Sequence, residues 1–405
     1  MVKQHEKCDL LILGAGIIGI SIGIAYLKAN SGKKVVIADK ENQPGKHASG
    51  RNSGVLHAGF YYSPESLKAK FCREGNSRLR ETAKKYGIPI REIGKVIVTR
   101  NIEEDSRLEQ LFERGLSNGV DLELLDESIL EDYEPLARTI NRFLWSPTTA
   151  VSDPRMLLQA LQGEFENLGG RLDFNTKVEL FESEGAINVV GNQYNALFIV
   201  NAAGAQADRI SRRVNVGLDY AMLPFMGEYR ATTQFHLPLK CLVYPVPHPV
   251  NPFLGVHFTI AIDGSVKVGP TAIPVFGREQ YSVQEGWSVS DSMQAIKGAY
   301  GLVRGDGHNL GAIVKSEWLK VIPRYLVREA SELVPSARNV KRWEKKPPGI
   351  RAQLVHLPSG KLEQDFVVKP YLNSIHVLNA VSPGWTSALP FGEWIVDEFI
   401  NRAAS

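Results

Sequence analysis

The sequence predicts an α/β protein in which a nucleotide-binding domain is interleaved with a domain built on an antiparallel sheet. Three observations lead to this fold class. A glycine-rich turn joins an apolar strand to an apolar helix near the N-terminus, strand and helix patterns alternate along most of the 405 residues, and a strand-rich stretch covers residues 222–271. A chain of this length buries a large core and is expected to form two domains.

The first element is an apolar run, DLLILGAGIIGISIGIAYLK, that starts at Asp9 and has about the length of a transmembrane helix. Its glycines argue against a membrane anchor, because glycine weakens a helix and three of them form the pattern Gly-x-Gly-x-x-Gly. Residues 9–13 are therefore predicted to form a buried strand, the glycines a tight turn, and residues 17–29 a helix that packs on a sheet.

A second apolar strand, KVVIADK, contains Asp39, about 20 residues after Gly19. A carboxylate at this distance contacts the ribose hydroxyls of a dinucleotide. Gly14 permits the turn, Gly16 lets the backbone approach a pyrophosphate, and Gly19 allows the helix to pack closely on the strand. Because the helix N-terminus also attracts phosphate, we expect a Rossmann-like dinucleotide site at these residues and the neighbouring Lys40.

The later segments continue the alternation of strands and helices. In chain order they are predicted to be a small-residue loop (49–62), an amphipathic helix (68–86), a strand-helix-strand unit (90–125), a capped helix with a strand (151–182), a strand with a turn and helix (195–211), the strand-rich stretch (222–271), a helical stretch (294–332), two strands (365–370 and 374–380) and a last helix from about Thr386.

This alternation predicts two interleaved domains rather than two consecutive ones. We assign residues 1–88, 150–215 and 346–405 to the nucleotide-binding domain, and residues 89–149 and 216–345 to the substrate domain.

Composition argues against several other classes of protein. The net charge is only +3 and the basic residues do not cluster with aromatic ones, so no nucleic-acid partner is expected. Cys8, Cys72 and Cys241 are scattered and form no Cys-x-x-Cys pair, which predicts reduced thiols in a cytoplasmic protein. The nine histidines show no ligand spacing, so no metal site is predicted. No export signal precedes the first strand.

The loop after the ribose carboxylate, KHASGRNSGVLHAGFYY, is dense in glycine, serine and asparagine, so its backbone can approach a second large planar group. Eight further segments follow a recognisable order with it: GAGIIG, SLKAKFC, NAAGAQADRI, PFMGEYR, YPVPHPVNPFLGVHFT, DGSVKVGPTAI, PPGIRAQL and NAVSPGWTSALPFGEWI. Through these segments the chain resembles, essentially end to end, the FAD-dependent oxidoreductases of the D-amino-acid oxidase superfamily. Within that superfamily it is most similar to the L-2-hydroxyglutarate oxidase and dehydrogenase family.

The resemblance implies a D-amino-acid oxidase-like fold, FAD as the cofactor, and oxidation of an L-2-hydroxy acid to the 2-oxo acid. It also implies that oxygen or a membrane quinone re-oxidises the flavin, the latter with peripheral contact at the inner face of the membrane. An amino-acid or amine oxidase of the same superfamily, a flavin-binding protein without turnover, and an NAD-binding structural protein stay open as alternatives.

The resemblance also assigns residues to the cofactor. Ser49, Arg51, Asn52 and Ser53 match the loop that passes the pyrophosphate and the flavin. The remaining cofactor positions are Val178 near the adenine, Ala203 and Gly204 on a bordering turn, and Gly384, Thr386 and Ser387 at a helix start facing the flavin pyrimidine edge.

Oxidation of a 2-hydroxy acid needs a hydride acceptor, a base for the hydroxyl proton and a cation for the carboxylate. His257 is our first expectation for the base and His57 the second, since His57 is also placed to pack against the flavin. Arg351 is the expected carboxylate clamp because its planar fork donates two parallel hydrogen bonds; a surface ion pair is the alternative. Tyr229 and Gln353 are expected to add polar contacts.

Lys267 is a further candidate, because a lysine near the flavin promotes its reaction with oxygen in the amine-oxidising relatives; a solvated lysine is the alternative. The chain departs from the family pattern at four positions. Met226 replaces an arginine, Arg230 replaces an aromatic residue, Thr271 replaces an amide and His248 replaces an acid. Arg230 and Thr271 are therefore expected to face the substrate and to alter specificity.

Overall fold

A computed structural model describes residues 6–190, 194–248, 254–282, 286–306 and 317–402. Part of one family segment (residues 249–253) and part of the predicted helical stretch (residues 307–316) lie outside the described residues.

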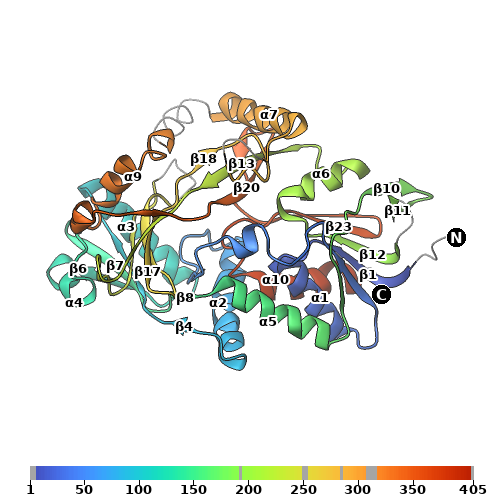
Figure 1. Ribbon diagram of the computed structural model, residues 1–405, viewed down its shortest axis with the longest axis horizontal. Coiled ribbons are helices and arrows are strands. Elements are labelled where there is room, and N and C mark those ends of the chain that lie inside the picture. The colour runs from blue at the N-terminus through green and yellow to red at the C-terminus, as the bar shows by residue number, and fades with distance from the viewer. Residues whose placement is uncertain (1–5, 191–193, 249–253, 283–285, 307–316, 403–405) are drawn as a thin grey trace.

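A six-stranded sheet forms one end of the molecule (Figure 1). Its strand order is β22-β23-β12-β1-β2-β9, and neighbours run parallel except β22 and β23. The strand β1 lies between β2 and β12, so that Leu10 is opposite both Val35 and Phe198. The bounds are β1 (Glu6–Leu13), β2 (Val35–Ala38), β9 (Arg171–Asp173), β12 (Tyr194–Asn201), β22 (Val367–Tyr371) and β23 (Ser374–Asn379).

Four helices accompany this sheet: α1 (Ile17–Ala29), α2 (Leu67–Lys85), α5 (Pro154–Asn167) and α10 (Ala388–Ile395), the last continued by a π-helical turn, η7 (Val396–Asn401). The glycines inside α1 and α10 allow close packing between helices. A Cβ on Gly23 would lie 2.6 Å from the Phe165 ring of α5, and one on Gly392 would lie 2.7 Å from the Ser21 backbone of α1. None of the described helices has the length and apolar content needed to cross a bilayer.

An eight-stranded sheet forms the opposite end of the molecule (Figure 1). Its order is β19-β14-β17-β16-β15-β5-β7-β6, and all neighbours are antiparallel except β15 and β5. The core of this sheet includes Leu108 of α3 and Leu326 of α9. The bounds are β5 (Lys95–Val98), β6 (Glu123–Asp126), β7 (Arg142–Ser146), β14 (Arg230–Thr233), β15 (Leu242–Pro245), β16 (His257–Ile260), β17 (Ser265–Gly269), β19 (Glu344–Lys345), α3 (Ile102–Ser117), α4 (Leu130–Tyr133) and α9 (Pro323–Ala330).

A four-stranded antiparallel sheet, β18-β13-β20-β21, connects the two ends and packs against α7. The strand β20 pairs along its length with β13, although the predicted boundary at residue 346 assigned it to the nucleotide-binding domain. The bounds are β13 (Tyr220–Gly227), β18 (Ile273–Pro274), β20 (Gly349–His356), β21 (Lys361–Leu362) and α7 (Val289–Asp306).

The short remaining elements join these layers. They are β3 (Val55–Leu56), β4 (Ile90–Arg91), β8 (Ala150–Ser152), β10 (Leu180–Ser183), β11 (Ala186–Val189), α6 (Ala207–Ser211), and the 3₁₀ turns η1 (Ala48–Gly50), η2 (Glu127–Ile129), η4 (Gly204–Gln206), η5 (Arg212–Val214) and η6 (Pro335–Asn339).

The prediction of an α/β fold with a mostly parallel sheet and an interleaved antiparallel sheet is confirmed. The domain limits themselves stay a prediction. The three cysteines are free and buried.

Candidate active site

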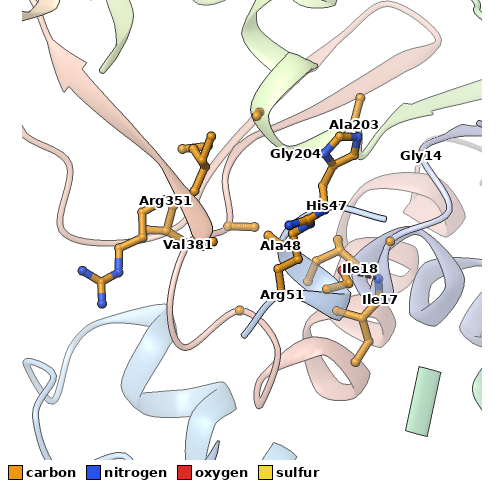
Figure 2. A pocket seen from close by; sticks show the side chains of 18 of the residues that line it. Gly14, Ile17, Ile18, His47, Ala48, Arg51, Ala203, Gly204, Arg351 and Val381 are labelled. Carbon is orange, nitrogen blue, oxygen red and sulfur yellow. Dashed lines mark hydrogen bonds between the residues drawn. The ribbon is translucent and has the colours of Figure 1, made fainter. Parts of the chain in front are cut away.

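A pocket of about 380 Å³ runs from the glycine-rich turn toward the sheets of the predicted substrate domain. Figure 2 shows Gly14, Ile17 and Ala203 around one end of it and Arg351 at the other. The carboxyl ends of the parallel strands β1, β2 and β12 lie beside Gly14 and Ala203, at one end of the pocket. Ligands of open α/β sheets bind at this edge of the sheet. The pocket therefore contains a nucleotide end and a substrate end.

At the nucleotide end, the turn between β1 and α1 holds Asp39 and Ser49 through its backbone N–H groups. Gly14 has φ +110°, and a Cβ there would lie 2.6 Å from the Ala202 carbonyl oxygen, so only glycine fits. The Ala15 N–H donates to Asp39 Oδ2 at 2.7 Å, and the Ile17 N–H donates to Ser49 Oγ at 3.0 Å. The carboxylate is thereby fixed at the end of β2.

Other predicted cofactor residues line the same pocket. They are Gly16, Lys40, Arg51, Asn52, Ser53, Val178, Ala203, Gly204, Gly384 and Thr386. Asn52 shapes its own loop, because its amide donates to the Ser49 carbonyl and accepts from the Gly54 N–H. Thr386 links the turn before α10 to the segment around β3. Its hydroxyl accepts a hydrogen bond from the His57 N–H and donates one to the Val55 carbonyl, each at 3.3 Å.

These features fit a flavin dinucleotide. The glycine turn and the first turn of α1 suit a pyrophosphate, and Asp39 suits a ribose. The Ser387 hydroxyl, at the start of α10, is buried and has no hydrogen-bond partner among the described residues. Ser387 lies outside the pocket lining, whereas His57 Nδ1, in the lining, is also buried without a hydrogen-bond partner among the described residues, and a bound polar group would satisfy it.

Residues 277–281, which we call the 277–281 segment, close one side of the nucleotide end. Tyr281 hydrogen-bonds through its hydroxyl to His47 Nδ1 at 2.7 Å, and its ring lies 4.1 Å from the Arg51 guanidinium carbon. Glu279 pairs with Lys40 at 2.9 Å. Arg278 is 2% exposed and pairs with the buried carboxylate of Asp208.

At the substrate end, His257 begins β16 and His57 follows β3, and both line the pocket. The His257 ring stacks on Tyr244, with ring centroids 3.8 Å apart and planes 17° apart. Its Nδ1 lies 2.9 Å from the Gly255 carbonyl oxygen. Because a carbonyl only accepts, Nδ1 carries the proton and Nε2 carries the lone pair of the neutral ring.

Both histidines are neutral at physiological pH. Burial, with smaller contributions from the Lys95 and Arg351 cations, lowers the pKa of His57 to about 3. Burial also lowers the pKa of His257 well below its usual value, and the charges of Arg351, His57 and Lys95 act in the same direction, whereas the hydrogen bond to Gly255 opposes them. A neutral imidazole is the form that accepts a proton.

Arg351 supplies a cation at this end. It lies on β20, lines the pocket, and is close enough to His57, His257 and Tyr229 to affect the pKa of each. Burial raises the pKa of Tyr229, which also lines the pocket, so its hydroxyl stays protonated and can donate a hydrogen bond.

Six predicted site residues lie outside the pocket lining: Gly19, Ser387, Lys267, Arg230, Thr271 and Gln353. A Cβ on Gly19 would lie 2.0 Å from the Gly14 carbonyl oxygen, which agrees with its expected packing role. The Thr271 hydroxyl accepts from the Glu228 N–H, and the Gln353 amide donates to the Glu363 carbonyl, so both side chains are engaged with backbone. Lys267 faces Asp263 and Lys346 rather than the histidines.

The four residues at which the chain departs from the family pattern all lie outside the pocket lining. Met226 packs against Ile273 and Val275, and His248 is exposed. Neither these two residues nor Arg230 and Thr271 line the pocket, contrary to the expectation that the latter pair face the substrate.

Sequence reasoning missed Lys95, Tyr244 and the 277–281 segment. A lysine between apolar residues in GKVIVTR, on a strand buried on both faces, is a signal that was available. The sequence carries no such signal for Tyr244 or for the 277–281 segment, because their contacts join parts of the chain far apart in sequence.

Comparison with known proteins agrees with this geometry. The sequence pattern of the family described as FAD dependent oxidoreductase matches residues 9–398. The chain is 34% identical to the L-2-hydroxyglutarate dehydrogenase of Escherichia coli K12, with 98% of this chain and 94% of the relative covered. Mitochondrial L-2-hydroxyglutarate dehydrogenases are 35% identical in Caenorhabditis elegans (98% and 94% covered) and 33% in Homo sapiens (97% and 89%).

Solved structures show the same fold. L-α-glycerophosphate oxidase from Mycoplasma pneumoniae, a structure with FAD bound, superposes with a TM-score of 0.75 at 22% identity, covering 97% of this chain and 95% of the other. Glycine oxidase from Geobacillus kaustophilus superposes with a TM-score of 0.70 at 18% identity, covering 98% and 95%.

Proposed function

Because the chain belongs to the FAD dependent oxidoreductase family, we propose that it oxidises an L-2-hydroxy acid to the 2-oxo acid, with L-2-hydroxyglutarate the first candidate. Its cofactor is FAD. The observation that carries the proposal is the meeting of the Arg351 cation with two neutral histidines at the end of the cofactor pocket. This combination matches a substrate that carries a carboxylate and a hydroxyl on adjacent carbons.

The reaction divides between the cofactor and the chain. The glycine turn, Asp39 and the loop from Ser49 to Ser53 would hold FAD, which when bound would supply flavin N5 as the hydride acceptor. Arg351 binds the substrate carboxylate and so orients the adjacent carbon, which is oxidised, within the pocket. His257 Nε2 takes the hydroxyl proton as the O–H bond breaks, while the hydride leaves the carbon with its electron pair and the carbonyl forms.

The electron acceptor for the second half of the reaction is oxygen or a quinone. The quinone alternative requires the protein to lie against a membrane. The face of α7 that carries Val289, Met293, Ile296, Tyr300 and Val303 suits such a contact, since these side chains recur every three or four residues and are 55% to 67% exposed.

The proposed substrate is tested by mixing the purified holoenzyme anaerobically with L-2-hydroxyglutarate, L-lactate, L-malate and a panel of L-amino acids. We expect loss of the flavin absorbance near about 450 nm with L-2-hydroxyglutarate. Loss with another hydroxy acid alone would replace the substrate and keep the reaction class.

Other outcomes favour the alternatives. Reduction by an amino acid, with an alkaline optimum because the amine must be uncharged, would support an amino-acid oxidase. A flavin that no compound reduces would contradict turnover and leave a flavin-binding protein.

A further inference from the structure

Lys95 is a buried cation with no anionic partner among the described residues. It lies on β5, an inner strand of the eight-stranded sheet between β15 and β7, and is 0% exposed. Its Nζ has no hydrogen-bond partner within the described part of the chain. An uncompensated buried ammonium costs several kcal/mol, roughly, so its presence calls for a physical reason.

Three aromatic rings surround this ammonium. Nζ lies 4.4 Å from the ring centroid of Phe60, 4.6 Å from that of Tyr61 and 4.8 Å from that of Tyr244. Cation–π attraction to these rings offsets part of the burial cost. Cys72 is the acidic group that acts on the pKa of Lys95, but burial raises the pKa of its thiol to about 12, so it carries no compensating charge.

The other buried cations of the described chain are paired differently. Arg278 contacts Asp208, Lys320 contacts Glu317, and Lys68 faces Asp365. Lys95 alone among these four faces histidines instead of a carboxylate. Burial lowers the pKa of Lys95 to about 7, so its charge is present on the acid side of neutrality.

Tyr244 connects Lys95 to the reaction site. The same ring that lies 4.8 Å from Lys95 Nζ stacks at 3.8 Å on His257, and both Tyr244 and His257 line the pocket. The ammonium is thus one aromatic ring away from the imidazole, in an interior where charges are weakly screened. A positive charge there disfavours the imidazolium form of His257 and of His57.

We propose that Lys95 is a positioning residue for the base: its charge, held in the Phe60, Tyr61 and Tyr244 rings, acts with burial to disfavour the imidazolium form of His257, so that Nε2 can take the hydroxyl proton. The role of this proton rests on the proposed function; the electrostatic effect on His257 does not. Arg351, His57 and Lys95 are the charged or titratable groups that act with burial on His257, and Tyr244 is the ring stacked on it.

The test compares the wild type with Lys95→Met, which keeps the length of the side chain and removes its charge. Lys68→Met is the matched control, because Lys68 is also buried and also lies near aromatic rings, at 5.9 Å from those of Tyr62 and Phe366, but faces Asp365. The holoenzyme is labelled with ¹³C-histidine, and the His257 signal is identified by its loss in His257→Gln. The signal is followed from the lowest pH at which the holoenzyme stays folded up to pH 9, so that the range includes the protonation of His257.

In Lys95→Met we expect His257 to take up its proton about one pH unit higher than in the wild type, since one weakly screened unit charge is worth on the order of 1 kcal/mol or more. The rate of flavin reduction by L-2-hydroxyglutarate is expected to fall at acid pH, and this fall should move to higher pH by the same amount. The constant rate at alkaline pH should stay the same. Lys68→Met should follow the wild type.

A His257 titration in Lys95→Met that coincides with the wild type at every pH overturns the inference, whatever happens to the melting temperature. Lys95→Arg, which stays charged, should restore the wild-type titration; if it titrates like Lys95→Met, charge is not the cause. If no hydroxy acid reduces the wild-type flavin, the proposed function fails while the histidine titration still decides the role of Lys95.

Discussion

At the scale of single residues, His257 and His57 differ in how their rings are held. The His257 ring is stacked on Tyr244 and tied by Nδ1 to the Gly255 carbonyl, so its Nε2 is the defined acceptor. His57 Nδ1 is buried and has no partner among the described residues, while its backbone carbonyl accepts from Asn76. The sequence predicted both residues, but the tautomer depends on a carbonyl that only the folded chain supplies.

His257→Gln should therefore slow anaerobic flavin reduction by about 10²- to 10⁴-fold, because the base is lost while FAD remains bound. Stopped-flow absorbance measures this rate directly. His57→Gln is the comparison. If His57→Gln causes the larger loss of rate, His57 is the base and His257 orients the substrate.

At the scale of elements, the sequence predicted regular pieces far better than connections. The helix predicted at residues 17–29 forms as α1 with the same bounds, and the helix predicted at 68–86 forms as α2 (Leu67–Lys85). The pairing of β20 with β13 was missed, because strand pairing depends on partners distant in sequence. Thr271 and Gln353 were expected to contact the substrate, because the sequence does not show which backbone groups lie beside them. Both side chains form hydrogen bonds with backbone instead.

The 277–281 segment leads to a prediction about cofactor retention. It lies between β18 and α7 and contacts three separate pieces of the nucleotide end, through Lys40, His47 and Asp208. Tyr281→Ala removes the hydrogen bond to His47 and the stacking on Arg51, together worth about 1 to 2 kcal/mol. The dissociation rate of FAD, followed by the fluorescence of the released flavin, should rise by about tenfold.

Phe276→Ala is the matched control, because Phe276 adjoins the segment and its side chain is 53% exposed. Its FAD dissociation rate should equal that of the wild type. An unchanged rate in Tyr281→Ala would mean that the segment does not limit cofactor release.

At the scale of the whole molecule, α7 lies at the periphery (Figure 1). The apolar side chains Val289, Met293, Ile296, Tyr300 and Val303 along one of its faces are exposed. Monomeric soluble proteins rarely expose a continuous apolar patch, so this face is expected to have a partner. Met293→Glu with Ile296→Glu should reduce co-sedimentation with anionic phospholipid vesicles severalfold, because charge opposes insertion into the interface. Flavin reduction by L-2-hydroxyglutarate should stay the same.

Ile102→Glu is the control for this experiment, since Ile102 is 74% exposed at the start of another helix, α3. Equal vesicle binding by all three proteins would contradict a membrane contact through α7.

The interleaving of the chain has a consequence for its synthesis. The strands β22 and β23 and the helix α10 come from the last 40 residues, yet they complete the sheet and cover α1 from the first 30. Until they leave the ribosome, the nascent chain presents β12 as an unpaired edge, and such edges invite pairing with other chains. We expect FAD to bind only after these elements have joined the sheet, because Gly384 and Thr386, which line the cofactor pocket, belong to the same late segment.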